Sequence, residues 1–271
     1  HLIEALINAT EHTPEGAAER GRAGVIGTIA YRFAGKGWPA PLTTPTAPLL
    51  QRTLAEMREL GATHVVMEAS SHALALGRLH GVRFRVAAFT NLSQDHLDFH
   101  GDMESYFQAK LSLFHDHLLP AAEGGRAVVL IDDEAGVRIA DSLPQGTCLR
   151  VSLDGPAEIS LRTEKQSLEG TVATFQTPVG ELTIQSRLTG RFNLANLAVA
   201  VGVGLALGLS PARISAGLSQ VEGVPGRLER LASPRTSPAG TATAASGPSV
   251  FIDYAHTPDA LERALAALRP L

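Results

Sequence analysis

Two clusters of polar side chains follow short apolar runs in this chain. Residues 63–67 lead into Glu68 and a Ser-Ser-His sequence, and residues 84–89 lead into a loop that carries Asp95 and His96. Because ligands bind beyond the carboxyl ends of parallel strands, we expect the two clusters to share one site. Carboxylate and imidazole donors without cysteine favour Mg²⁺ over Zn²⁺. Loop capping by aspartate and solvated histidines is the alternative that these residue types leave open.

A lysine interrupts the apolar face of the helix that we expect over residues 102–119. The residues of this face are spaced by three or four positions, and they are Met103, Phe107, Lys110, Phe114 and His117. A lysine within such a face needs a partner, a lowered pKa or a chemical modification, unless its stem packs while its amine reaches solvent. The polar loop directly before the helix makes a functional lysine as reasonable as a solvated one.

The elements that must position these groups alternate between strand and helix. This order predicts an α/β fold with a mostly parallel central sheet flanked by helices, and a small antiparallel β patch over residues 157–189. We expect strands at 24–33, 63–67, 84–89, 127–131 and 250–253, and helices at 46–60, 102–119, 191–209, 211–218 and 258–268. Buried parallel strands are covered on both faces, and we expect this of residues 63–67. Residues 233–248 are rich in Ser, Thr, Pro, Ala and Gly, which predicts a mobile surface loop.

Composition excludes several classes of protein. The net charge of −4 gives no basic surface for nucleic acid, and no apolar run is long enough to insert into a membrane. The single cysteine, Cys148, excludes an internal disulfide and fits the reducing cytoplasm. We interpret it as a small, partly buried apolar residue.

Longer motifs around these clusters resemble a known family. The segments are Met67–Leu74 (MEASSHAL), Thr90–Gly101 (TNLSQDHLDFHG), Tyr106–Lys110 (YFQAK), Gly190–Asn196 (GRFNLAN), Pro225–Glu229 (PGRLE) and Asp253–Ala260 (DYAHTPDA). Together, and in this order, they are similar to the UDP-N-acetylmuramyl-tripeptide synthetases, which are Mur ligases. The motifs are long and extend over most of the chain.

The resemblance implies a reaction and a metal site. In this family ATP phosphorylates a carboxylate of UDP-N-acetylmuramyl-dipeptide, and the amine of a diamino acid then attacks the acyl phosphate. Glu68 matches a Mg²⁺ ligand beside the ATP phosphates, and His96 matches a ligand of a second Mg²⁺. Lys110 matches a lysine that forms a carbamate with CO₂, and a carbamate is an anionic oxygen ligand suited to a hard cation.

Contacts to the muramyl substrate carry over in part. Thr43, Thr44, Ser70 and Arg78 match residues that hold this substrate, although Thr43 and Thr44 could instead be a helix N-cap and its neighbour. The family usually has glutamine two residues before the arginine. Leu76 stands there in this chain, so one substrate hydrogen bond is expected to be missing or supplied elsewhere.

Three further residues match contacts to ATP. Asn196 resembles an adenine contact, Arg227 a phosphate contact and Asp253 a ribose contact. The alternatives are a polar residue on a helix surface, a surface ion-pair partner and a cap of the last helix, respectively.

The printed sequence departs from the family at the phosphate-binding loop. No glycine-rich Gly-Lys-Thr loop occurs in it, and residues 1–6 resemble the helix that follows such a loop. We therefore expect residues 1–257 to be a central ATP-binding domain without its phosphate loop, and residues 258–271 to begin a connection to a C-terminal domain. On this interpretation the parent is a cytoplasmic ligase of peptidoglycan synthesis, and the chain as it stands does not turn over ATP.

Other functions stay open at this point. The chain could belong to a related ATP-dependent ligase, such as a folylpolyglutamate or cyanophycin synthetase, or be a non-catalytic partner module. The residues do not show whether the added amino acid is meso-diaminopimelate, lysine or ornithine.

Overall fold

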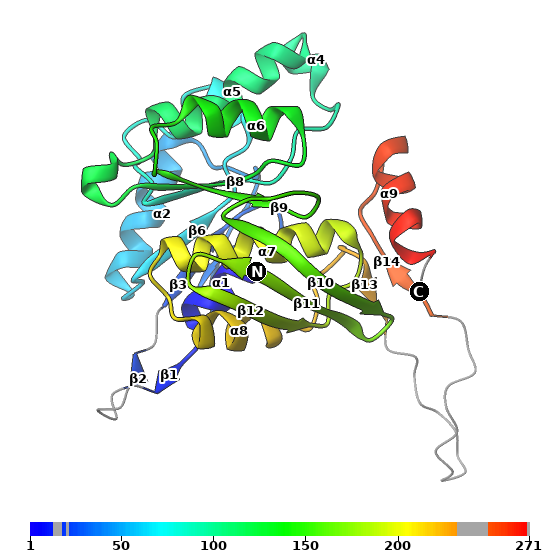
Figure 1. Ribbon diagram of the computed structural model, residues 1–271. Helices are drawn as coiled ribbons and strands as arrows, with labels where there is room; N and C mark the ends of the chain where they lie inside the picture. The colour runs from blue at the N-terminus through cyan, green and yellow to red at the C-terminus, as the bar shows by residue number, and fades with distance from the viewer. Residues whose placement is uncertain (13–17, 20–21, 232–248, 270–271) are drawn as a thin grey trace, which may run out of the picture.

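The main sheet combines parallel and antiparallel strands. The computed structural model describes residues 1–12, 18–19, 22–231 and 249–269 (Figure 1). Six strands pair in the order β12-β11-β10-β9-β8-β7, and they are β7 (Val86–Phe89), β8 (Arg126–Leu130), β9 (Cys148–Ser152), β10 (Ile159–Ser167), β11 (Gly170–Thr177) and β12 (Gly180–Ser186). Strands β7 to β10 are parallel, and β10 to β12 are antiparallel. The predicted α/β fold is confirmed, and the antiparallel patch is continuous with the parallel strands through β10.

A second sheet lies beside the first. It has the order β5-β4-β3-β6, and its strands are β3 (Ala23–Ile26), β4 (Tyr31–Phe33), β5 (Lys36–Trp38) and β6 (His64–Met67). Strand β3 pairs parallel with β6 and antiparallel with β4. The single segment expected at 24–33 is therefore two strands, because the chain reverses where Gly27 N donates to Ala30 O at 3.2 Å. Short pairs β1 (Glu11–His12) with β2 (Ala18–Glu19) and β13 (Glu229–Arg230) with β14 (Phe251–Ile252) complete the described strands.

Helices cover both faces of the six-stranded sheet (Figure 1). They are α1 (Leu2–Asn8), α2 (Ala47–Glu59), α3 (Ser71–Ala75), α4 (Leu97–His100), α5 (Met103–Asp116), α6 (Glu134–Ser142), α7 (Arg191–Ala206), α8 (Pro211–Ser219), α9 (Pro258–Leu268) and a 3₁₀ turn at Ala121–Glu123. Neighbouring side chains of a strand point to opposite faces. Val128 accordingly packs in the core with α7, whereas Val129 packs in the core with α5 and α6.

Helix α7 is mostly apolar, and its residues from Leu197 to Gly204 are buried. It packs on strands β7 to β11 and against α1 and α8. Two glycines of α7 allow close approaches, since a Cβ at Gly202 would lie 2.6 Å from Val128 Cγ1 of β8 and one at Gly204 would lie 2.7 Å from Ile214 Cγ1 of α8. Across the part of the chain that the structure describes, no helix combines the length and apolarity needed to cross a membrane.

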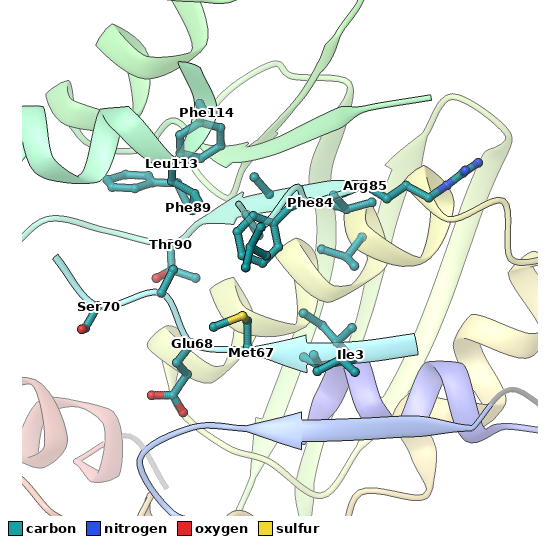
Figure 2. A pocket seen from close by; sticks show the side chains of 18 of the residues that line it. Ile3, Met67, Glu68, Ser70, Phe84, Arg85, Phe89, Thr90, Leu113 and Phe114 are labelled. Carbon is teal, nitrogen blue, oxygen red and sulfur yellow. The ribbon is translucent and has the colours of Figure 1, made fainter. Parts of the chain in front are cut away.

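The two sheets present their free edges to one another across a cavity. Strand β6 ends one sheet and β7 ends the other, and the cavity between them has a volume of about 880 Å³ (Figure 2). Met67, Phe84 and Phe89 are among its apolar lining residues. Strand β6 is therefore half-buried, whereas residues 63–67 were expected to be covered on both faces.

The loop predicted at 233–248 lies outside the described residues.

Candidate functional site

The proposed metal ligands come from three places in the fold. Glu68 directly follows β6, His96 precedes α4, and Lys110 lies on α5. All three line the same cavity, which opens at the carboxyl ends of β6 and β7, where Glu68 and Thr90 lie (Figure 2). Members of both polar clusters and the lysine therefore line one cavity, while their grouping into a single metal site stays a prediction. Their individual roles stay a prediction.

Lys110 is held in a largely apolar setting. Phe107 and Phe114, its neighbours on the same helix face, are buried, while Lys110 itself is half-buried. Its Nζ lies 5.0 Å from the centre of the Tyr106 ring. Burial lowers the pKa of the Lys110 amine, and the nearby Asp95 carboxylate opposes this shift in part. A lowered pKa increases the fraction of neutral amine, which is the form that reacts with CO₂.

His96 adopts a backbone conformation that is unusual for its type. Its φ is +57°, in the left-handed region, and its side chain is 45% exposed. Asp95 stabilises this turn, because its Oδ1 accepts a hydrogen bond from His96 N at 2.7 Å. Left-handed non-glycine residues cost free energy and gather at functional sites. The turn directs the His96 ring towards the ring of His72, at 4.9 Å between centroids.

Aromatic and imidazole rings pack against one another beside Lys110. His100 stacks on Tyr106 at 4.9 Å with 20° between the ring planes, and its Nε2 lies 2.9 Å from Ser71 Oγ. Burial, followed by the charge of neighbouring imidazoles, lowers the pKa of both His72 and His100, so both rings favour the neutral form. Sequence reasoning assigned no role to His72, His100 or Tyr106, although all three stand inside the quoted motifs.

The residues matched to the muramyl substrate form a network around Glu68. The Thr44 hydroxyl donates to Glu68 O at 2.7 Å and accepts from Ser70 N at 3.0 Å, while Arg78 donates to Thr44 O at 3.2 Å. Thr44 is fully buried, whereas Thr43 and Ser70 line the cavity. The Thr44 hydroxyl thus organises the backbone of the site.

Helix α2 does not use Thr43 or Thr44 as its cap. Its N-cap residue is Thr46, whose side chain makes no capping hydrogen bond. The N-cap alternative for the threonine pair is therefore wrong. Leu76, which stands where a glutamine was expected, ends α3 with 55% of its surface exposed.

The residues matched to ATP lie elsewhere. Asn196 is on α7, Arg227 is exposed before β13, and Asp253 follows β14; none of them is among the described residues that line the cavity. Asp253 joins two segments, since its carboxylate accepts from Leu228 N and from Ala255 N, each at 2.8 Å. The cap of α9 is Thr257, so the alternative role of Asp253 as that cap is wrong.

Two further observations limit the chemistry of the site. Burial raises the pKa of the Cys148 thiol to about 11, which keeps it protonated and agrees with a structural role. Among the residues that the structure describes, no group of three or more His, Cys, Asp and Glu side chains is placed to hold a metal ion. A cation beside Glu68 and His96 therefore needs additional ligands.

Comparison with known proteins shows the family. The model of the Mur ligase middle domain matches residues 2–204. The chain belongs to the Mur ligase middle-domain family. It is 46% identical over 270 residues to the UDP-N-acetylmuramoyl-L-alanyl-D-glutamate–2,6-diaminopimelate ligase of Gloeobacter violaceus, covering 100% of this chain and 50% of that protein. The protein of the same name from Geobacter metallireducens is 45% identical over 245 residues, which is 89% of this chain and 45% of that protein.

A solved structure agrees with this Mur ligase assignment. The structure of a UDP-N-acetylmuramoyl-L-alanyl-D-glutamate–2,6-diaminopimelate ligase superposes on the chain with a TM-score of 0.76 at 30% identity. The match covers 99% of this chain and 50% of that one. The chain thus spans about half the length of the Mur ligases that it matches.

Proposed function

We propose that this chain is the central part of an ATP-dependent ligase of peptidoglycan synthesis in the cytoplasm. The ligase joins a diamino acid to UDP-N-acetylmuramoyl-L-alanyl-D-glutamate through an acyl phosphate. The names of the relatives support 2,6-diaminopimelate as that amino acid. The observation that supports the proposal is that Glu68, His96 and Lys110 all line the cavity between the two sheets.

The donor chemistry of the cavity fits Mg²⁺. Glu68 would hold one cation, and His96 with a carbamylated Lys110 would hold a second. When bound, the cations neutralise the charge that collects on the transferred phosphoryl group. The neutral Lys110 amine would add to the carbon of CO₂ and release a proton, and the resulting carbamate would supply the oxygen ligands that the cation at His96 needs.

The remaining roles rest on the resemblance to the Mur ligases. We assign contacts with the muramyl substrate to Thr43, Thr44, Ser70 and Arg78; Thr43 and Ser70 line the cavity, and Arg78 donates to Thr44 O, which supports this assignment. We assign ATP contacts to Asn196, Arg227 and Asp253, residues 1–257 to the ATP-binding domain, and residues 258–271 to the start of a connection to a further domain.

Phosphate release by the complete protein tests the proposal. We expect release that requires ATP, Mg²⁺, the UDP-muramyl-dipeptide and a diamino acid, with 2,6-diaminopimelate preferred over lysine and ornithine. Lys110→Ala should abolish it, and a small carboxylic acid or added bicarbonate should restore part of it. Lys165 is an exposed lysine on β10, so Lys165→Ala is the matched control and should stay active. Normal turnover by Lys110→Ala would show that the carbamate is not needed.

A further inference from the structure

A residue outside the motifs touches the Glu68 carboxylate. Strand β3 pairs with β6 so that Ile26 lies opposite Met67, which places the residues after each strand side by side. The Thr28 hydroxyl lies 2.6 Å from Glu68 Oε2 and 3.0 Å from Thr43 Oγ1. Thr28 therefore links the proposed metal ligand to a proposed substrate contact.

The direction of these hydrogen bonds follows from counting protons. An ionised carboxylate only accepts, and a threonine hydroxyl has a single proton to donate. Thr28 must give its proton to Glu68, so the proton between the two threonines comes from Thr43. The three groups form a chain in which Thr43 donates to Thr28 and Thr28 donates to Glu68. Hydrogen bonds to a charged acceptor are stronger than neutral ones, which favours this order.

The backbone beside Thr28 makes room for the same carboxylate. A Cβ at Gly27 would lie 2.6 Å from Glu68 Oε1 and 3.0 Å from its Cδ, so any side chain there would displace the carboxylate. Glu68 is thus fixed at Oε2 by the Thr28 hydroxyl and lies at Oε1 against the bare backbone of Gly27. Glu68 is exposed, and a long exposed side chain loses conformational entropy when it is held in one orientation, so these two contacts are what we expect to fix it.

We propose that Thr28 is a positioning residue that orients the Glu68 carboxylate for its cation. The proposal rests on the proposed function of Glu68 as a Mg²⁺ ligand. Groups that hydrogen-bond to a metal ligand set its orientation, and losing them typically lowers metal affinity or activity by about 10- to 100-fold. It also follows that Thr43 turns its lone pairs to the cavity, so the substrate group that it meets is a donor, such as an amide N–H or a hydroxyl.

The first measurement needs no metal and uses the chain as it is. Three-bond NMR couplings report the Glu68 side-chain rotamer, and we expect one rotamer in the parent chain and averaging in Thr28→Val. Thr28→Ser keeps the hydroxyl and should restore the single rotamer. Thr174→Val is the matched control, because it removes a hydroxyl bonded to Thr183 at 2.9 Å on β11 and β12 and should leave Glu68 unchanged. An unaltered Glu68 rotamer in Thr28→Val overturns the proposal.

The second measurement is made on the complete protein. The Mg²⁺ concentration for half-maximal phosphate release should rise about 10- to 100-fold in Thr28→Val and return close to the parent value in Thr28→Ser. An unchanged Mg²⁺ requirement overturns the positioning role. If the parent protein releases no phosphate with any diamino acid, the proposed function fails, while the rotamer measurement still decides whether Thr28 orients Glu68.

Discussion

Two buried threonines predict opposite results for the same substitution. Thr44 is fully buried, and its hydroxyl donates to Glu68 O at 2.7 Å and accepts from Ser70 N at 3.0 Å. Thr53 of α2 is equally buried, yet its hydroxyl oxygen has no hydrogen-bond partner among the described residues. Valine has nearly the shape of threonine, so Thr→Val at each position changes the hydroxyl and little else.

The structure gives a magnitude for each change. Thr44→Val leaves one backbone carbonyl and one backbone N–H without a partner, at about 1–3 kcal/mol each. The adjacent cavity lets water reach part of the Ser70 backbone, so we expect a loss of about 2–4 kcal/mol in the free energy of unfolding. Thr53→Val removes a buried hydroxyl that gains nothing from burial, and we expect a stabilisation of about 1 kcal/mol.

Urea unfolding measures both effects. The only tryptophan, Trp38, lies on β5 and donates to Glu56 at 2.8 Å, so its fluorescence reports the sheet beside Thr44. Far-UV circular dichroism reports the whole fold. We expect a lower midpoint for Thr44→Val and a slightly higher one for Thr53→Val, with the same slope in both.

Two results would refute this reasoning. One is a loss below about 0.5 kcal/mol in Thr44→Val, the range expected for an uninvolved surface residue. The other is an equal loss in Thr53→Val, because the cost would then come from the shape of the side chain and not from hydrogen bonds.

Three further outcomes are expected. His64 N and Glu68 N donate to backbone oxygens on the β3 side, so the two-residue period of β6 directs the Val65 and Met67 amides into the cavity. Hydrogen exchange at these two amides should be much faster than at Val128 and Val129 of the central strand β8. Equal protection would contradict the free edge of β6. Calorimetric titration of the 271-residue chain with Mg²⁺-ATP should show weak or no binding, because the sequence contains no Gly-Lys-Thr loop to hold the phosphates. An affinity for ATP equal to that of the complete protein would refute the need for this loop. Burial lowers the pKa of His64, His72 and His100, so the unfolded chain binds more protons than the folded chain below the ordinary histidine pKa of about 6.5. The urea midpoint of unfolding should therefore fall as the pH drops from 7.5 to 5.5. A midpoint that stays level or rises would show that these rings are not held neutral.

Local patterns were enough to predict most of the elements. The helix expected at 102–119 is α5, and the strand expected at 84–89 contains β7, because spacing along the chain is set by the period of each element. The polar clusters after residues 67 and 89 also predicted that Glu68 and His96 line one cavity, since parallel strands deliver their ends to one edge. These features depend on residues that are close together in the sequence.

Pairing between distant residues had to come from the tertiary structure. The segment at 24–33 divides at a turn into β3 and β4, which pair with each other. Local spacing could not show that β3 also pairs with β6, about 40 residues away. The pairing with β6 brings Thr28 to Glu68.

The sequence by itself determined the order of elements, the two polar clusters and the position of Lys110 within the apolar face of α5. Only the tertiary structure decided that Thr44 is a buried organiser while Thr43 faces the cavity, although the two are identical neighbours. The physical reason is that successive residues at a strand end or in a loop point in different directions. Which direction meets a partner depends on backbone atoms that are brought together from other parts of the chain.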